Sequence, residues 1–299
     1  MTLPEETGLG DDDDVAMRGV TMTRIPSTTV DQRRLYQHYH SVPDAAAYAE
    51  MLDMEQRWIV ALTDRFEAEA PRFMSLAHLL DGMRAFLAEE AAVPSDNHSF
   101  LALEATIEQF KVVVAEFAVD GLTESQSLLP IVSVLPYKAA MSVFRVFIDE
   151  FGCGNEEQAH SQLYRNLLTE LGMATDVACY LDSINPESFA YVNHFHWLAS
   201  RAPAPEYFLG GYAYFEASVL YGFRSYAHAA ARLGIKNGRY YTEHLYIDNY
   251  HSKHMRTALR ETDRDIGLDL AKVWAGVELT SAIVSDATEA AIARARGAG

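Results

Sequence analysis

Apolar residues recur every three or four positions along most of this chain, beginning near Ser41. This spacing places them on one face of an α-helix, whereas a strand would need strict alternation, which no segment sustains. The pattern predicts helices at about residues 41–68, 72–90, 100–127, 137–151, 156–171, 174–183, 187–200, 206–233, 240–261 and 263–294. We therefore predict an all-α fold, a bundle of about eight helices in a single domain.

Residues 1–30 differ from the rest because they contain proline, glycine and the acidic run 11–14 but no apolar periodicity. Such a segment buries too little apolar surface to fold alone, so we expect a flexible tail. Residues 31–299 are predicted to form one domain, since the proline-rich stretch at 202–205 is too short to separate two. Within the apolar helix 206–233, the pair Gly210-Gly211 would allow a neighbouring helix to approach closely.

The chain has 299 residues with 42 acidic and 24 basic side chains, a formal net charge of −18. Nucleic acids and anionic membranes are bound by basic surfaces, so neither is an expected partner. The two cysteines are too few for a disulfide framework. The sequence contains no uninterrupted apolar run of about eighteen residues, which a membrane span would need. It also does not begin with a basic segment followed by an apolar run, which a secretory signal would need. These features lead us to expect a soluble cytoplasmic protein.

The predicted helix 240–261 carries the most informative polar pattern. His244, Asp248 and His251 stand at positions i, i+4 and i+7, which return to one stripe of a helix at roughly 100° per residue. Two imidazoles and a carboxylate in one stripe are ligands that suit iron or manganese. Taken alone, the stripe is equally compatible with surface residues and one hydrogen-bonded core histidine.

Two glutamates lie in apolar helical segments, where a bare carboxylate is unfavourable. Glu150 ends one such segment and Glu216 lies in the middle of another. Burial of a carboxylate costs several kcal/mol unless it is paired or binds a metal, and no lysine or arginine obviously faces either residue. A cation shared with the histidine stripe would satisfy both. His160 adds a third imidazole, and Glu157 three residues before it forms an E-x-x-H spacing that could also bind a metal.

The order of these residues resembles that of a known family. A glutamate, then Glu-x9-His, then a glutamate, then His-x3-Asp-x2-His is similar to the heme-oxygenase-like diiron oxidases and oxygenases, the iron-containing redox enzymes. The resemblance covers about residues 115–260. The matching segments are Ile148–Gly154 with His160 and Leu163, Glu216 with Ala217, Glu243–His251, and Glu124 followed by Leu128, Pro130, Leu135 and Lys138.

This resemblance implies a heme-oxygenase-like helical bundle that holds two ferrous ions, with O2 as co-substrate and an external electron donor. Reduction of O2 would then lead to attack on a C–H bond or an amine. Glu116 competes with Glu124 for the first ligand position, and Glu157 could replace one of the glutamate ligands that the resemblance implies. The ligands that the resemblance implies are Glu124, Glu150, His160, Glu216, His244, Asp248 and His251.

We expect an O2-dependent diiron oxidase that acts on a small amino acid in natural-product biosynthesis, by desaturation, cyclisation or a related oxidation. Alternatives within the family are an N-oxygenase and a fatty-acid decarboxylase. A homodimer is compatible with the sequence. Candidate residues for binding the substrate are Arg224, Tyr212, Tyr221 and Asn193.

Two other classes of protein are rivals. A non-catalytic binding module on the same fold would need only one histidine, and its carboxylates would lie on the surface. A ferritin-like iron store would need Glu-x-x-His on each of two helices, but only the spacing that ends at His160 is present.

Overall fold

The computed structural model describes residues 29–298, and this part of the chain contains thirteen α-helices and no strand. The prediction of an all-α fold is therefore confirmed, although the number of helices exceeds the expected eight because several predicted helices are divided. The expected flexible tail, residues 1–30, lies almost wholly outside the described residues. The first helix is α1 (Gln32–Tyr39), which begins where Asp31 accepts a hydrogen bond from the backbone N–H of Arg34.

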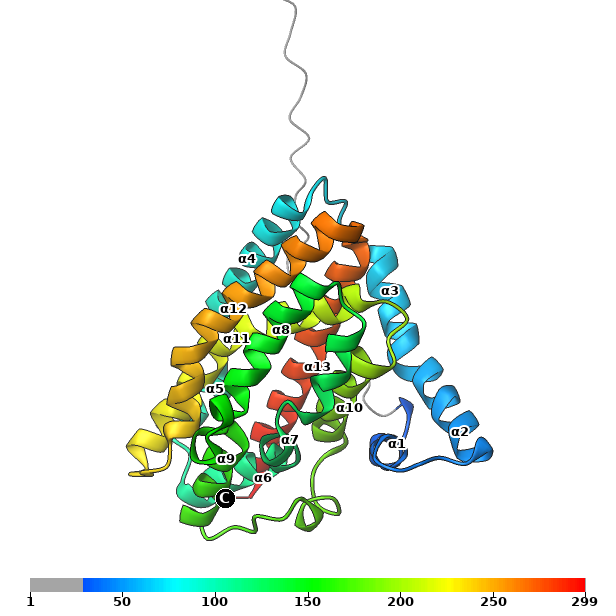
Figure 1. Cartoon of the computed structure of the whole chain (residues 1–299). Helices are drawn as coiled ribbons and strands as arrows, with labels where there is room; N and C mark the ends of the chain where they lie inside the picture. Colours follow the sequence, from blue (N-terminus) through cyan, green and yellow to red (C-terminus); the bar gives the residue numbers. More distant parts are fainter. Residues whose placement is uncertain (1–28, 299) are drawn as a thin grey trace, which may run out of the picture.

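Three long helices form the centre of the bundle: α11 (Pro205–Arg232), α12 (Arg239–Ile266) and α13 (Leu270–Gly297). Helix α11 packs against both α12 and α13, while α8 (Tyr137–Glu150) packs against α12. In Figure 1, α13 runs through the middle of the molecule behind α8, and α12 lies along one side. The helices α8, α11 and α12 therefore face one another around a common interior.

The close contact between α11 and α13 depends on small residues. A Cβ atom added at Gly210 would lie 1.8 Å from the carbonyl oxygen of Val273, and one at Gly276 would lie 2.1 Å from that of Tyr207. Any side chain at either position would push the two helices apart. The expectation that Gly210-Gly211 allows a close approach is confirmed, and α13 is the helix that approaches.

The remaining elements surround this centre. Helices α1 and α2 project as a lobe at one corner of the molecule, and α3 and α4 cover the end opposite α9 (Figure 1). Their bounds are α2 (Ala45–Glu55), a π-helical turn η2 (Gln56–Val60), α3 (Ala61–Glu69), α4 (Leu76–Ala92), α5 (Asp96–Leu103), α6 (Ile107–Glu116), α7 (Ala118–Thr123), the 3₁₀ segment η3 (Gln126–Ser133), the 3₁₀ turns η4 (Gly152–Gly154), η5 (Glu156–Gln158) and η6 (Val177–Cys179), α9 (His160–Glu170) and α10 (Pro186–Ser200).

The single helix predicted at 100–127 is broken into three, which changes the position of a candidate ligand. Helix α6 begins anew because Thr106 and Gln109 form a reciprocal capping box, and the backbone of Phe117 is not helical (φ −100°, ψ 9°). Glu124 then follows the short α7 with an extended backbone (φ −45°, ψ 134°). It lies at the end of an element and not on a helical face.

Other predicted boundaries also shift. Helix α9 begins at His160, because the residues before it form 3₁₀ turns, and residues 174–183 contain only the short turn η6. Both cysteines are free thiols, and none of the helices in the described part of the chain has an apolar stretch long enough to cross a membrane.

Candidate metal centre

The seven predicted ligands come from five places in the chain and meet in the interior between α8, α11 and α12. Glu150 is the last residue of α8 and His160 the first residue of α9. These two are linked by a tight return of the chain at Gly152, whose φ is +64° and where a Cβ would lie 2.5 Å from the backbone nitrogen of Ala159. Glycine is therefore required at this turn.

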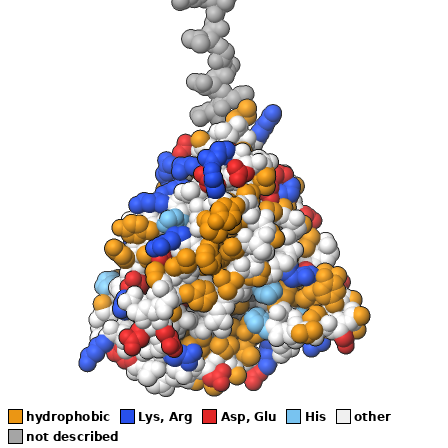
Figure 2. Space-filling model, viewed as in Figure 1, with side chains coloured by type: hydrophobic (Ala, Val, Ile, Leu, Met, Phe, Trp, Pro, Cys, Tyr) orange, Lys and Arg blue, Asp and Glu red, His pale blue; other side chains and the backbone are white. Residues whose placement is uncertain are grey.

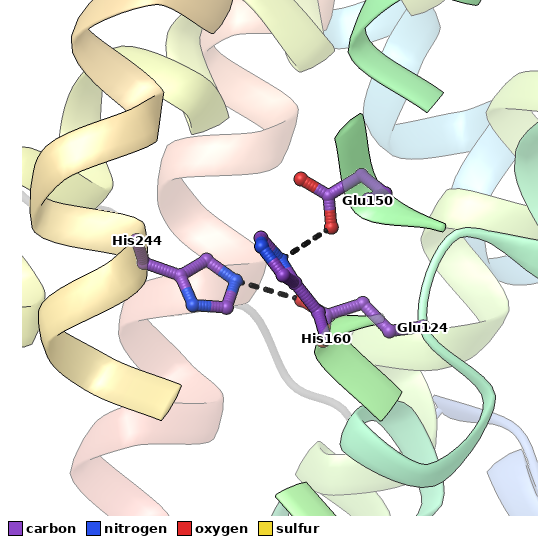
Figure 3. Close-up of side chains that lie close together, drawn as sticks. All are labelled: Glu124, Glu150, His160 and His244. Carbon is purple, nitrogen blue, oxygen red and sulfur yellow. Dashed lines mark hydrogen bonds and ion pairs between the residues drawn. The ribbon is translucent and has the colours of Figure 1, made fainter. Parts of the chain in front are cut away.

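The first group of side chains consists of Glu124, Glu150, His160 and His244, whose candidate ligand atoms all lie within 4.8 Å of one another. The Nε2 atom of His244 is 2.9 Å from Oε1 of Glu124. In the second contact within this group, Nδ1 of His160 is 2.7 Å from Oε2 of Glu150. Figure 3 shows the ring of His160 next to the ring of His244, with Glu150 and Glu124 on the side away from His244.

The second group lies beside the first and consists of Glu150, Asp248 and His251, with Glu216 in contact. The Nδ1 atom of His251 is 3.1 Å from Oε2 of Glu216, 3.2 Å from Oδ1 of Asp248 and 3.3 Å from Oε1 of Glu150. Glu150 therefore directs Oε2 toward His160 of the first group and Oε1 toward His251 of the second. A carboxylate in this position can bridge two cations.

These side chains fit metal binding because their buried polar atoms are not satisfied by the protein. Both carboxylate oxygens of Asp248, Oε2 of Glu124 and Nε2 of His251 have no hydrogen-bond partner among the described residues. Asp248 is 1% exposed and Glu216 3% exposed, and in the described part of the chain neither forms an ion pair with lysine or arginine. Buried carboxylates without a counter-charge are strongly destabilising, and bound cations would remove this penalty.

The charges within the centre determine the protonation of its histidines. Burial lowers the pKa of His244, but the charge of Glu124 and its hydrogen bond outweigh this effect and raise the pKa to about 10. Burial likewise lowers the pKa of His251, but the charge of Glu216 and the nearby carboxylates of Asp248 and Glu150 raise it to about 11. Without metal, protons therefore take the place of cations.

The two central carboxyl groups respond in opposite directions. Burial raises the pKa of Glu150, but the charge of His160 and its hydrogen bond outweigh burial and lower the pKa to about 2. Burial and then the charge of Glu216 raise the pKa of Asp248 to about 7. The pKa of Asp248 is raised although Nδ1 of His251 lies 3.2 Å from its Oδ1 atom.

Residues around the centre hold the imidazoles in place. The Nδ1 atom of His244 lies 2.7 Å from the carbonyl oxygen of Tyr240, which requires a proton on Nδ1 and leaves Nε2 to face Glu124. The Nε2 atom of His251 faces Oδ2 of Asp149 at 3.8 Å.

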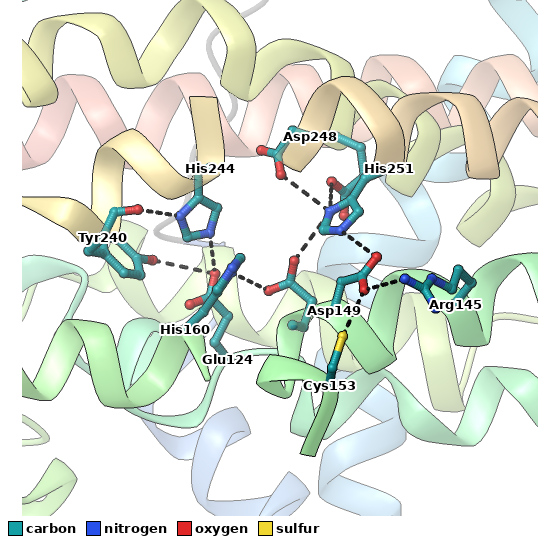
Figure 4. Close-up of polar contacts among 11 residues, drawn as sticks. Glu124, Arg145, Asp149, Cys153, His160, Tyr240, His244, Asp248 and His251 are labelled. Atoms are coloured by element: carbon teal, nitrogen blue, oxygen red, sulfur yellow. Dashed lines mark hydrogen bonds and ion pairs between the residues drawn. The ribbon is translucent and has the colours of Figure 1, made fainter. Parts of the chain in front are cut away.

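Asp149 is itself held from two sides. Arg145 forms an ion pair with its Oδ1 atom at 3.0 Å, and the thiol of Cys153 donates a hydrogen bond to the same oxygen at 3.2 Å. Figure 4 shows this chain of contacts leading from Arg145 to His251. Such outer contacts are typical of metal-binding histidines.

A cavity of about 350 Å³ adjoins the centre. Glu124, Glu150, Glu216, His244 and Asp248 line its inner end. The rest of the wall is formed by α1, α7, η3, α10 and α11, and its residues are Tyr39, His40, Asp120, Thr123, Ser125, Gln126, Ser127, Leu128, Pro130, Tyr191, Val192, Phe195, His196, Ser200, Tyr212 and Phe215. This volume suits a small organic molecule.

Of the four predicted substrate-binding residues, only Tyr212 lines the cavity. Asn193 is fully buried and donates hydrogen bonds to the backbone and side chain of Gln32 at 2.7 and 3.0 Å. Tyr221 is 43% exposed, and the guanidinium of Arg224 lies over its ring at the surface. The helical periodicity of α11 places Tyr212 and Glu216 on the inner face and these two residues on the outer face.

The alternative ligands are also placed outside the centre. The carboxylate of Glu116 is bound by Arg294, by the hydroxyl of Ser188 and by the backbone N–H of Asn185, and so has a structural role. Glu157 is exposed in the turn η5. Neither residue competes with Glu124 or Glu150 for a position beside the histidines.

Sequence reasoning missed Asp120 and Asp149. Asp120 lies four residues before Glu124, a helical spacing that could have marked it as a neighbour. Asp149 directly precedes Glu150, and its contact with His251 arises only from the packing of α8 on α12. The remaining wall of the cavity comes from α1, η3 and α10, whose proximity no local pattern indicates.

Comparison with known proteins adds to these observations. The family model described as an iron-containing redox enzyme matches residues 111–283, which is more than half of the chain and includes all seven predicted ligands. The nitrosourea synthase of Streptomyces achromogenes subsp. streptozoticus is 29% identical over 147 residues, which are 48% of this chain and 31% of that protein. The chain thus spans about a third of this relative. From the extent of the family match, the chain belongs to the iron-containing redox enzyme family, with its heme-oxygenase-like all-α fold.

Proposed function

We propose that this protein is an O2-dependent oxidase or oxygenase that uses two ferrous ions to oxidise a small organic molecule. The observation that carries this proposal is the pair of adjoining buried groups that share Glu150. Four carboxylates, Glu124, Glu150, Glu216 and Asp248, contribute four negative charges. Two divalent cations would neutralise them, since the neutral imidazoles add no charge.

Each residue has a distinct role in this proposal. Glu124, His160 and His244 would hold one iron, and Glu216, Asp248 and His251 the other, with Glu150 between them. The bound irons would supply the electrons that first reduce O2. The carbonyl of Tyr240 fixes the tautomer of His244, and the surrounding apolar helices keep bulk water away from the centre.

The cavity would place the substrate next to the irons. Its inner end is formed by candidate ligands, and the aromatic rings of Tyr191, Phe195, Tyr212 and Phe215 form much of its wall. Such a wall excludes water from the bond to be oxidised and fixes the orientation of a small substrate. The natural substrate would therefore be compact and partly apolar.

Electron balance requires a further reactant. Oxidation of one C–H or N–H bond removes two electrons from the substrate, and reduction of O2 to the level of water consumes four. An external donor would therefore deliver the other two electrons in each turnover. The family assignment supports redox chemistry of this kind. The residues of the centre do not indicate which donor supplies these electrons.

Oxidation at carbon is our first proposal, and oxidation at nitrogen is the second. The nitrosourea synthase relative favours the second, because a nitrosourea contains an oxidised nitrogen. A non-catalytic binding module is disfavoured, because it would leave the buried carboxylates of Glu150, Glu216 and Asp248 with histidine as their only positive partner among the described residues.

Anaerobic loading with ferrous iron, followed by mixing with O2 and a panel of small amines and amino acids, tests the proposal. We expect about two irons per chain and consumption of O2 coupled to substrate oxidation. Mass spectrometry separates the two chemistries, since desaturation removes two hydrogens and N-oxygenation adds an oxygen atom. A Glu150→Ala variant should lose both coupled turnover and full iron loading. Retention of both would contradict the proposal.

A further inference from the structure

One carboxylate in the cavity is left over when the proposed centre is assembled. Asp120, on α7, lines the cavity together with the candidate ligands Glu124, Glu150, Glu216 and Asp248. Only the latter four belong to the proposed centre, whose charge two ferrous ions would balance. Asp120 is therefore a fifth carboxyl group beside the centre, and two ferrous ions would not balance its charge when it is ionised.

The imidazole of His244 offsets the charge of Asp120 only in part. Among the described residues its contacts include a hydrogen bond with the hydroxyl of Tyr191, and no lysine or arginine forms an ion pair with it. Burial and the negative charge of Glu124 raise the pKa of Asp120 well above its usual range. A positive group in the cavity would relieve this repulsion.

The rest of the cavity wall is also free of permanent positive charge. No lysine or arginine is among the lining residues in the described part of the chain. Burial lowers the pKa of His196 to about 4, so this histidine is neutral at pH 7. Arg201 follows the lining residue Ser200, but its guanidinium is bound to both carboxylate oxygens of Glu55. Apart from the proposed metal centre, the wall therefore offers an anionic substrate group no lysine or arginine as a partner.

Aromatic rings and hydroxyl groups complete an environment that suits a cation. Tyr39 and His196 are stacked with ring centroids 4.2 Å apart, and the hydroxyl of Tyr39 donates a hydrogen bond to Glu55. Tyr191 and Phe195, which also line the cavity, form an edge-to-face pair. The faces of such rings attract ammonium and guanidinium groups. Figure 2 shows histidine side chains at the surface where the lobe of α1 and α2 meets the bundle.

From this arrangement we propose that the cavity binds a substrate that carries an organic cation, an alkylammonium or a guanidinium, and that Asp120 pairs with it. This inference rests on the proposed function for the identity of the cavity as the substrate site. Because Asp120 is near enough to feel the charges of Glu124 and Glu150, the cationic group is directed toward the inner end of the cavity.

A set of probes with matched size tests the sign of the charge. Hexylammonium, hexanol and hexanoate have the same chain length and differ in charge. Butylguanidinium represents the guanidinium class of cation. Binding is measured by calorimetry without O2, on protein loaded with ferrous iron, because the metal-free carboxylates would attract any cation. We expect both cations to bind at least about tenfold more tightly than hexanol, with hexanoate weakest.

Variants then identify the residue. Asp120→Asn should weaken hexylammonium binding about tenfold or more and leave hexanol binding unchanged, whereas Asp120→Glu should retain the preference. Asp182→Asn removes an exposed carboxylate that pairs with Arg33 and serves as the control. The probe series on the unaltered protein gives a result even if Asp120→Asn does not fold.

Three results would overturn the inference: hexanol or hexanoate binding as tightly as hexylammonium, equal cation binding by Asp120→Asn and the parent, or no binding by any probe. Iron content, measured on the same samples, reports separately on the proposed function. Low iron content in the parent would count against the diiron centre, and the cation site would then be judged by the difference between Asp120→Asn and the parent at equal iron content.

Discussion

Glu150 is the residue on which the proposed centre depends most. Its two oxygens face different histidines, His160 at 2.7 Å and His251 at 3.3 Å. No other side chain in the described part of the chain belongs to both groups of candidate ligands. The position of Glu150 at the end of α8, before the turn at Gly152, is therefore what joins two half-sites into one.

Asp149 supports the proposed second iron without binding it directly. Replacement with asparagine keeps the shape but removes the negative charge that faces Nε2 of His251. We expect Asp149→Asn to weaken the binding of one iron roughly 10- to 100-fold and to leave the other unchanged. Anaerobic iron titration of the variant measures the two affinities.

A matched control is Asp53→Asn, which removes an exposed carboxylate that also pairs with an arginine one helical turn away. Two iron affinities unchanged in Asp149→Asn would show that Asp149 does not position His251. Equal weakening of both irons would instead indicate a general loss of structure.

Iron binding should release protons from the two histidines with raised pKa values. At pH 8 the metal-free protein holds a proton on His244, with its pKa of about 10, and on His251, with its pKa of about 11. Iron binds neutral imidazole, so we expect release of about two protons per chain, measured with a pH electrode in weakly buffered anaerobic solution. Iron uptake without proton release would contradict this account.

These protons also make the stability of the metal-free fold dependent on pH. A histidine with a raised folded-state pKa stabilises the fold fully below about pH 6.5, the unfolded-state value. The contribution is lost as the pH rises through about 10 to 11. We therefore expect the metal-free protein to lose stability in alkaline solution more steeply than the iron-loaded protein.

At the scale of elements, α12 was the most predictable part of the site. His244, Asp248 and His251 lie on one face because the helical repeat requires it, and all three are buried in the structure. Glu216 was predictable for a similar reason, since it lies in the middle of a long apolar helix. Local periodicity was sufficient for these residues because each lies inside a regular element.

Among the candidate ligands at the ends of elements, Glu124 was predictable only through the family resemblance, whereas His160 was also noted as a third imidazole. Glu124 lies after α7 on extended backbone, and His160 opens α9 after two 3₁₀ turns. Neither position follows from a helical repeat. The cavity was not predictable, because α1, η3 and α10 line it through tertiary contacts. The same reason applies to Arg224 and Tyr221, which the sequence indicated as candidates for binding the substrate, since both lie on the outer face of α11 and do not line the cavity.

The crossing of α11 and α13 fixes the helix that carries Glu216. A methyl group at position 276 would lie 2.1 Å from the carbonyl oxygen of Tyr207, so we expect Gly276→Ala to destabilise the fold by about 1–3 kcal/mol or more. Gly222, also inside α11, has open space around it. Gly222→Ala should therefore stabilise the fold by about 0.5–1 kcal/mol. Urea unfolding of both metal-free variants makes the comparison, and equal midpoints would refute the close crossing.

At the scale of the whole molecule, bound iron should contribute to stability. The metal-free interior contains carboxylates of Asp248 and Glu216 that lack cationic partners other than histidine. Iron that binds only the folded state stabilises it by about 2.7 kcal/mol when its concentration is 100 times the dissociation constant. We expect anaerobic iron to raise the midpoint of thermal unfolding and a chelator to reverse the change. A midpoint that does not respond to either would contradict metal binding in the core.

The central claim is that seven side chains hold two irons around Glu150, and anomalous X-ray scattering at the iron absorption edge tests it most directly. Crystals of the anaerobically loaded protein should show two peaks on opposite sides of the Glu150 carboxylate. One would be in contact with Glu124, His160 and His244, and the other with Glu216, Asp248 and His251. A single peak, or iron located outside this interior, would contradict the account.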